Sequence, residues 1–252
     1  MDASGIEFLI ELHRTGHLPK SNGSIAEIGA QELFLSDSPE TLAKFMSEFA
    51  HDAGRDHLEE LAELAKRGPA RRLFELANWS YICVDTSGEF GAIPLDLNFD
   101  SIPEDHQGRY DLVTNFGCTE HIANQLNAFK AIHDLVKVGG LMIHAVPTQG
   151  FIDHGLVNYS AKFFWRLAEY NNYRLIDMRL TTHSEPKAIP DTFSLTFSYY
   201  DKNLKMQDTI LWSAFKRTSA TDFVVPFDGA IRSKHLACRY PADLVEKYNS
   251  IF

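Results

Sequence analysis

The sequence predicts an α/β fold whose core is a doubly wound, mostly parallel sheet. Short apolar runs alternate with segments of helical periodicity up to about residue 150, a pattern typical of such sheets. The first two apolar runs, 24–28 and 81–85, carry a carboxylate at or near their ends, Glu27 and Asp85. The run 141–146 is nearly all apolar, which is typical of a central parallel strand.

The first half of the chain predicts one helix before the sheet and three after its first strand. Residues 1–20 contain a short amphipathic helix that ends near Gly16. Ser38 and Pro39 form a helix start, because the hydroxyl can cap the helix and proline suits its first turn. Helical spacing of apolar residues then predicts helices in three segments: 38–49, 58–65 and 73–77.

The next elements continue the alternation. Strands are predicted at 92–96, 110–116 and 141–146, and a helix at 126–135 is expected to stop at Gly139–Gly140. Pro147 is expected to end the last of these strands, because proline cannot donate to a central ladder.

After residue 150 the pattern changes. We expect an aromatic-rich helix and a strand, followed by a hairpin-like pair of strands at one edge of the sheet. Residues 218–252 show little periodicity and form a C-terminal extension that wraps the domain or mediates association. The predicted segments are the helix 160–170, the strand 173–180 and the paired strands 193–200 and 209–215, joined by 201–203.

The composition predicts an ordinary globular domain. The 252 residues are 44% hydrophobic and 23% charged, enough to bury a sizeable core. A net charge of -10 argues against a nucleic-acid or anionic-membrane partner. Three separated cysteines suggest neither a disulfide framework nor a zinc site. An acidic N-terminus and the lack of a long apolar run make a reduced, cytoplasmic location the expectation.

The loop after the first strand restricts the cofactor. A dinucleotide needs several glycines for close approach of its pyrophosphate, whereas only Gly29 is present and Glu32 would repel a phosphate. The chain also lacks a G-K-[ST] phosphate loop. These features disfavour NAD, FAD and ATP, and with them a nicotinamide-dependent reductase.

S-adenosylmethionine carries no phosphate, and acidic strand ends suit its amine and its hydroxyl groups. We expect Glu27 to face the amine through water, and Gly29 to let the backbone pass beneath the methionine part. Asp85 is expected to accept both ribose hydroxyls, because a carboxylate only accepts hydrogen bonds. Asp96 is expected to accept from the adenine amino group.

From about residue 21 to 180, the chain resembles the class I S-adenosylmethionine-dependent methyltransferases. The family pattern of an acidic glycine loop, two later acidic strand ends and a D-L-V…E-H…L-K-P-G-G signature is matched in order. Val138 stands where proline is common in that signature. The matching residues are Glu27–Ala30, Asp85, Asp96–Leu97, 110–113, 118–121 and 135–141.

The resemblance implies a Rossmann-like, seven-stranded sheet whose last strand is antiparallel. It also implies S-adenosyl-L-methionine as the cofactor and methyl transfer to an O, N, C or S nucleophile. The residues expected to bind the cofactor are Glu27, Gly29, Ala30, Gln31, Asp85, Thr86, Asp96, Leu97, Asn115, Phe116 and Gly117.

The chain departs from the family pattern in two places. Gln31 and Leu33 occupy positions often held by glycine. The segment between the first two strands is also longer than a single crossover helix requires. We interpret residues 36–68 as a helical insertion that forms either a lid near the site or an extra packing layer. A single domain over residues 1–252 is expected.

Methyl transfer needs mainly alignment of donor and acceptor in a dry site. A base is needed only for a protonated acceptor, and His154 and His121 are the candidates, in the loops after two strands. His144 lies inside a strand and is interpreted as a core residue. One or two rings among Tyr159 and 163–165 are candidates for an acceptor pocket, although packing in the core is the simpler interpretation.

No metal is expected, because Asp153 and Glu120 do not amount to a carboxylate cluster. The leading hypothesis is an enzyme that methylates a small-molecule or sugar-like acceptor, with no nucleic-acid or membrane partner. The alternative is a non-catalytic scaffold or partner protein whose cofactor site has decayed. Assembly into a homo-oligomer is left open.

Overall fold

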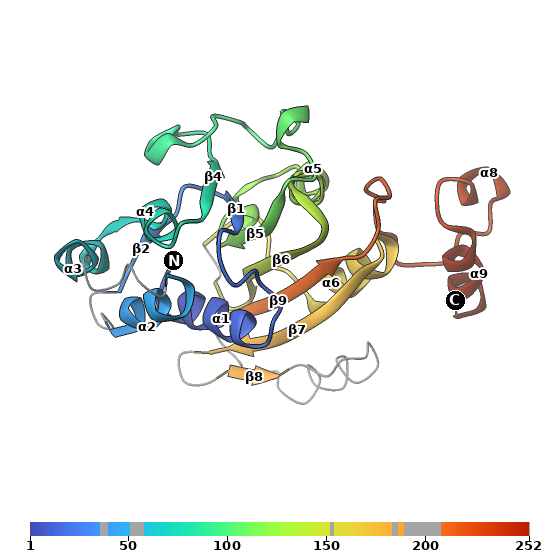
Figure 1. Cartoon of the computed structure of the whole chain (residues 1–252). Helices are drawn as coiled ribbons and strands as arrows, with labels where there is room; N and C mark the ends of the chain where they lie inside the picture. Colours follow the sequence, from blue (N-terminus) through green and yellow to red (C-terminus); the bar gives the residue numbers. More distant parts are fainter. Residues whose placement is uncertain (36–39, 51–57, 152–153, 183–185, 189–207, 252) are drawn as a thin grey trace.

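The chain is built around a twisted sheet that has helices on both faces (Figure 1). The computed structural model describes residues 1–35, 40–50, 58–151, 154–182, 186–188 and 208–251. Within these ranges the main sheet has seven strands in the order β4-β1-β5-β6-β9-β7-β8. Their bounds are β1 Ser24–Ile28, β4 Ser80–Val84, β5 Tyr110–Phe116, β6 Val136–Gln149, β7 Tyr173–Thr181, β8 Pro186–Ala188 and β9 Thr209–Arg217.

The strand directions are those of a doubly wound sheet with one reversed strand. β4, β1, β5 and β6 are parallel, and β9 lies antiparallel between β6 and β7. The predicted fold class is therefore confirmed. The strand expected at 209–215 is β9, whereas its expected hairpin partner 193–200 and the turn 201–203 lie outside the described residues.

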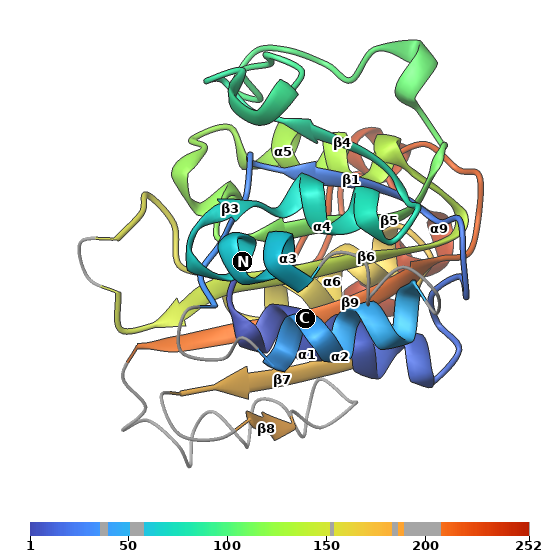
Figure 2. The same cartoon turned by 60° about the vertical axis from the view of Figure 1, so that its left-hand side comes forward.

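Helices cover the sheet in two groups. α1 to α4 lie over one face, and α5 and α6 lie over the other (Figure 2). A two-stranded sheet of β2 (Glu32–Leu33) and β3 (Gly68–Pro69) borders the first group. The helices are α1 Ala3–Arg14, α2 Glu40–Phe49, α3 Leu58–Lys66, α4 Ala70–Leu76, α5 Gln125–Leu135, α6 Ala161–Tyr170, α8 Lys234–Ala237 and α9 Ala242–Ile251, with short 3-10 helices η1 Glu89–Gly91, η2 Glu104–His106 and η3 Thr119–His121.

Side-chain alternation along the strands creates two cores. On β1, Ile25 belongs to the core beneath α1 to α4, and Ala26 belongs to the core beneath α5 and α6. Successive strand residues point to opposite faces, and each face is apolar here. A parallel sheet covered on both sides requires this composition.

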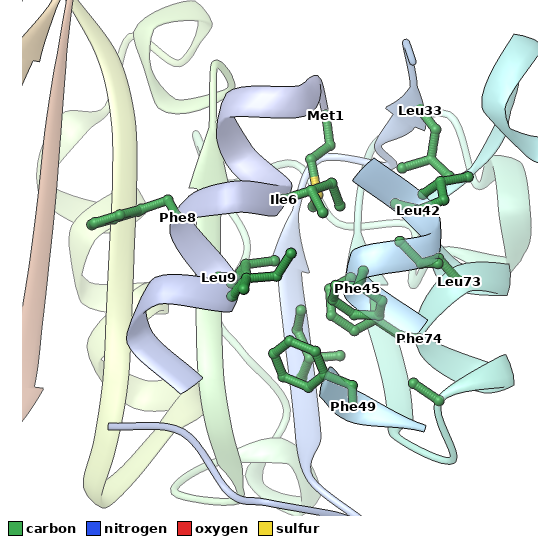
Figure 3. Close-up of a cluster of buried hydrophobic side chains, with 14 of the residues drawn as sticks. Met1, Ile6, Phe8, Leu9, Leu33, Leu42, Phe45, Phe49, Leu73 and Phe74 are labelled. Carbon is green, nitrogen blue, oxygen red and sulfur yellow. The ribbon is translucent and has the colours of Figure 1, made fainter. Parts of the chain in front are cut away.

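The first core joins α1, α2 and α4 (Figure 3). Phe45 stacks on Phe49 with ring centroids 4.3 Å apart, and it meets Phe74 edge-on at 5.6 Å. α2 and α3 both belong to the segment 36–68 that was interpreted as an insertion. The buried side chains of α2, among them Leu42 and Met46, pack in this core.

The strand predicted at 92–96 does not form. In the described chain this segment makes a single bridge between Val84 and Ile93, with Ile93 donating to the Cys83 carbonyl at 2.8 Å. Ile93 also accepts from the Asp85 amide at 3.2 Å, and the pairing goes no further along this described segment. The seventh strand is β8 at the opposite edge.

The junction between α5 and β6 also differs from the prediction. The helix ends at Leu135, and β6 begins at once, so that Gly139 and Gly140 lie within the strand. A Cβ at Gly140 would lie 2.8 Å from the Tyr110 carbonyl oxygen, so only glycine fits this irregular pairing. Pro147 likewise lies inside β6, next to a shift in register, where proline is tolerated.

The C-terminal extension packs on the end of α6. Tyr248 of α9 stacks on Tyr170 with ring centroids 6.0 Å apart, and Arg166 lies 4.1 Å above the Tyr248 ring. Of the helices within the described ranges, none combines the length and apolar character that crossing a bilayer demands.

Arg217, at the end of β9, holds the α5–β6 junction in place. Its guanidinium, 9% exposed, donates to the carbonyls of His133 and Val136, each at 2.9 Å. Arg217→Met should therefore lower the free energy of unfolding by roughly 3 kcal/mol, because buried carbonyls lose their donors. Urea denaturation measures this. Arg174→Met, at an exposed position of β7, is the control, and equal effects of the two changes would contradict the role assigned to Arg217.

Candidate functional site

The carboxyl ends of β4, β1 and β5 lie level with one another. Ile28 of β1 is opposite Val84 on one side and Asn115 on the other. The strand order reverses at β1, and ligands of open α/β sheets bind at such switch points. A cavity of about 450 Å³ lies here, within the range for small ligands and cofactors.

The loops that follow the three strands, together with the segment 95–98, form the wall of this first cavity. Eight of the predicted cofactor-binding residues line it: Gly29, Ala30, Gln31, Asp85, Thr86, Asp96, Leu97 and Gly117. The sequence did not indicate the other lining residues Ile28, Val84, Leu95, Asn98, Cys118 and Ile122, most of which are apolar and carry no chemical signal of their own.

Gly29 is required by both conformation and space. Its φ is +88°, and an added Cβ would lie 3.1 Å from the Cys118 Sγ atom. Its amide donates to the Val84 carbonyl at 2.8 Å, which fixes the start of the loop. A single glycine therefore suffices for this turn. Because Gly29 has no side chain, the backbone itself lines the cavity at this point.

Asp85 joins the loops after β1 and β4. One carboxylate oxygen accepts from the Ala30 amide at 2.9 Å, and the other accepts from the Ser87 amide at 2.8 Å. Desolvation acts to raise the pKa of Asp85, but these two hydrogen bonds outweigh it and hold the pKa below its usual value. The group is an anion at neutral pH, with lone pairs left for further donors such as ribose hydroxyls.

The segment 95–98 forms the opposite wall. The Asp96 carboxylate accepts from the backbone and side-chain nitrogens of Asn98, both at 2.9 Å, which orients it in a tight turn. Leu95, Leu97 and Ile122 add apolar surface beside it. Apolar walls with one oriented carboxylate fit a purine ring and its amino group.

Three predicted cofactor residues, Glu27, Asn115 and Phe116, do not line the first cavity, and their role toward the cofactor stays a prediction. Glu27 is fully buried, and its carboxylate accepts from Tyr81 and Thr114, because it precedes the loop and points to a face of the sheet. Asn115 is buried and bonds the Thr119 hydroxyl at 2.8 Å. Phe116 instead lines a neighbouring cavity.

This second cavity, of about 250 Å³, adjoins the first. Gln31 and Gly117 line both. Three aromatic rings, Phe34, Phe116 and Trp212, dominate its wall, and the remaining lining residues are Met1, Asp2, Gly5, Ala145 and Ile210. The sequence did not predict this cavity, because its rings come from segments far apart along the chain.

The two candidate histidines lie together. His121 lines the first cavity, and the ring centroids of His121 and His154 are 5.1 Å apart. The His154 Nε2 atom lies 3.5 Å from the Glu120 carboxylate. Burial raises the pKa of Glu120 above its usual value.

Other chemically suggestive side chains belong to the core or stay neutral. Burial lowers the pKa of His144 to about 3, in agreement with its interpretation as a core residue. Tyr159 and Phe164 are buried, and neither lines the two cavities. Burial raises the pKa of Cys118 to about 12, so its thiol stays protonated and is a poor nucleophile.

The strand order and the acidic site at the switch point have the arrangement expected of a Rossmann-like methyltransferase. The family model described as "Methyltransferase domain" matches residues 52–185, more than half of the chain. The chain therefore belongs to this family and is an S-adenosylmethionine-dependent methyltransferase. The matched segment contains Asp85, Asp96 and His121, whereas the Gly29 loop precedes it.

Solved structures of similar fold include a 1,6-didemethyltoxoflavin-N1-methyltransferase from Burkholderia thailandensis, with bound 1,6-didemethyltoxoflavin and S-adenosylhomocysteine. It is 10% identical, with 86% of this chain and 78% of that chain covered and a TM-score of 0.45. For an S-adenosylmethionine-dependent methyltransferase from Archaeoglobus fulgidus these values are 13%, 84%, 94% and 0.44. At such identities the similarity concerns the fold alone. No curated protein matches the chain.

Glu27 should make stability depend on pH. Burial raises its pKa from 4.5 to about 7, so between these values the folded state holds a proton that the unfolded state has lost. The free energy of unfolding should therefore fall as pH rises through this window, by about 3 kcal/mol at most. Glu27→Gln should remove this contribution. Urea denaturation of both proteins at pH 5 and pH 8 measures the difference, and parallel pH profiles would contradict it.

Proposed function

We propose that this methyltransferase acts on a small-molecule acceptor that enters the second cavity while the cofactor occupies the first. The observation that carries the proposal is the shared boundary at Gln31 and Gly117. A cofactor in the first cavity and an acceptor in the second would come together at this boundary, which is lined by Gly117 and the Gln31 side chain. A volume of about 250 Å³ suits a small molecule or a single ring of a larger one.

The residues of the first cavity fit S-adenosylmethionine, which supplies a methyl group already activated on a sulfonium. In this proposal Asp85 accepts from ribose hydroxyls, and Asp96 accepts from the adenine amine. Among the described residues that line this cavity there is no lysine or arginine, so none of them would oppose the sulfonium with a positive charge. The backbone at Gly29 and Ala30, which lines the cavity, would pass beneath the methionine part.

The second cavity favours an apolar or aromatic acceptor. Trp212 is 6% exposed, whereas Phe34 is 59% exposed, so one ring forms a fixed wall and the other lies at the entrance. The Trp212 ring contacts Phe116 with centroids 5.6 Å apart, which gives a rigid surface for a flat molecule. Alignment between these rings would place the acceptor for in-line attack.

A protonated acceptor would need a base. His121 is the candidate that lines the cofactor cavity, and His154 is its neighbour. An acceptor whose nucleophile is already unprotonated would need neither.

Asp85→Ala should weaken binding of S-adenosylhomocysteine at least tenfold, since the ribose loses its acceptor and the two loops lose their link. Isothermal titration calorimetry measures this, with Glu104→Ala, an exposed acid in η2, as the control. Unchanged affinity would contradict the ribose assignment. No binding to the unaltered protein would instead favour the alternative of a non-catalytic scaffold.

Phe34→Ala should lower methyl transfer about tenfold at low acceptor concentration and leave affinity for S-adenosylhomocysteine unchanged, because it alters the second cavity alone. Transfer of labelled methyl groups to a panel of small aromatic acceptors measures this. Phe227→Ala removes another exposed ring, 40% accessible, outside both cavities. Equal rates in both variants would show that the acceptor does not use the second cavity.

A further inference from the structure

Glu120, His121 and His154 form a cluster at the edge of the first cavity. Glu120 and His121 belong to η3, after β5, and His154 lies in the loop after β6. One carboxylate oxygen and one ring nitrogen of each histidine all lie within 4.8 Å of one another. The loops of two neighbouring parallel strands therefore bring three metal-ligating side chains together.

Glu120 is the unusual member of the cluster. It is 0% exposed, and within the described residues neither carboxylate oxygen has a hydrogen-bond partner. A buried carboxylate without donors is costly, and proteins pair such groups or use them to bind cations. The carboxylate lies under Gly117, where an added Cβ would be 3.3 Å from Oε1, and so it is aimed toward the boundary of the two cavities.

The backbone holds His154 close to this carboxylate. The amides of Leu156 and Val157 both donate to the Glu120 carbonyl, at 2.8 and 3.2 Å. Gly155 allows the close approach, because a Cβ there would lie 2.9 Å from the Glu120 Cγ atom. The proximity of His154 to Glu120 is thus built into the fold of both loops.

We propose that Glu120, His121 and His154 bind one divalent cation of the zinc class. Two imidazoles and one carboxylate are a known ligand set for catalytic zinc, which leaves at least one coordination position open. Ligand atoms around a tetrahedral zinc ion lie roughly 3.3 Å apart, and His154 Nε2 and Glu120 Oε1 are already at 3.5 Å. A small movement of the exposed histidines closes the remaining distances.

The open position of the ion would face the first cavity, because His121 lines that cavity. An oxygen or nitrogen atom of the acceptor is the ligand that suits this position. The proposal departs from the expectation of no metal, which considered carboxylates alone and did not consider histidines brought in by another loop. It also excludes a base role for these histidines while the ion is bound, since a ligating imidazole cannot accept a proton on the same nitrogen.

Zinc binding to the full chain, without cofactor or acceptor, tests the proposal independently of methyl transfer. Calorimetric titration with zinc chloride should show one equivalent bound, and X-ray absorption at the zinc edge should show nitrogen and oxygen ligands without sulfur. His154→Ala should weaken binding about 10- to 100-fold, and Glu120→Gln at least as much. Zinc should raise the melting temperature of the unaltered protein but not that of Glu120→Gln.

The matched control is His17→Ala. His17 lies near the cationic Arg174 and Lys216, where a metal ion is disfavoured, so this change should leave zinc affinity within about twofold. The His154 side chain is exposed, so His154→Ala should fold normally. This variant therefore tests the site even if the buried change Glu120→Gln impairs folding. Absence of binding, sulfur in the zinc shell, or equal affinity in the His154 and His17 variants would overturn the proposal.

Discussion

The site depends on one carboxylate that two loops share. β1 and β4 end at the same level, so their loops leave the sheet side by side, with backbone amides that have no partner in the ladder. Asp85 accepts from the amide of Ala30 in one loop and from that of Ser87 in its own. This link fixes the distance between the floor of the first cavity and its wall. It also keeps the carboxylate ionised, so the group that organises the loops still has lone pairs to offer to a ligand.

The second cavity shows how the sheet and segments outside it combine in one site. Phe116 ends β5, Trp212 lies in the reversed strand β9, and Phe34 follows the short strand β2. Ala145 of β6 pairs with Phe116 on one side and with Trp212 on the other, so the two rings lie at the same end of the sheet. In the proposed arrangement the methyl group passes from one cavity to the other beside Gly117, which has no side chain to block the boundary.

The sequence predicted most of the sheet, because buried parallel strands are continuous apolar runs. β5 has the predicted bounds 110–116, and α6 covers 161–170 where a helix was predicted at 160–170. The prediction was wrong where backbone pairing decides the outcome: the segment 92–96 pairs with β4 at one bridge only, whereas Gly139 and Gly140 lie within β6. The site followed the same rule. Residues in the strand-end loops could be assigned to the site from the order of the strands along the chain. Phe34 and Trp212 are far apart in the sequence and line one cavity only because the chain folds.

Two buried glutamates at this end of the sheet show why local context decides a role. Glu27 receives hydrogen bonds from the Tyr81 and Thr114 hydroxyls, so the fold itself supplies partners for its carboxyl group although the residue stands beside the glycine loop. Glu120 is equally buried, yet in the described chain its carboxylate lacks any such donor and has two histidines nearby. Desolvation raises the pKa of both groups, so burial alone does not separate them. What separates them is the chemistry of their neighbours: hydroxyl groups complete a hydrogen-bond network, whereas imidazoles that point at a bare carboxylate complete a coordination shell once a cation is present.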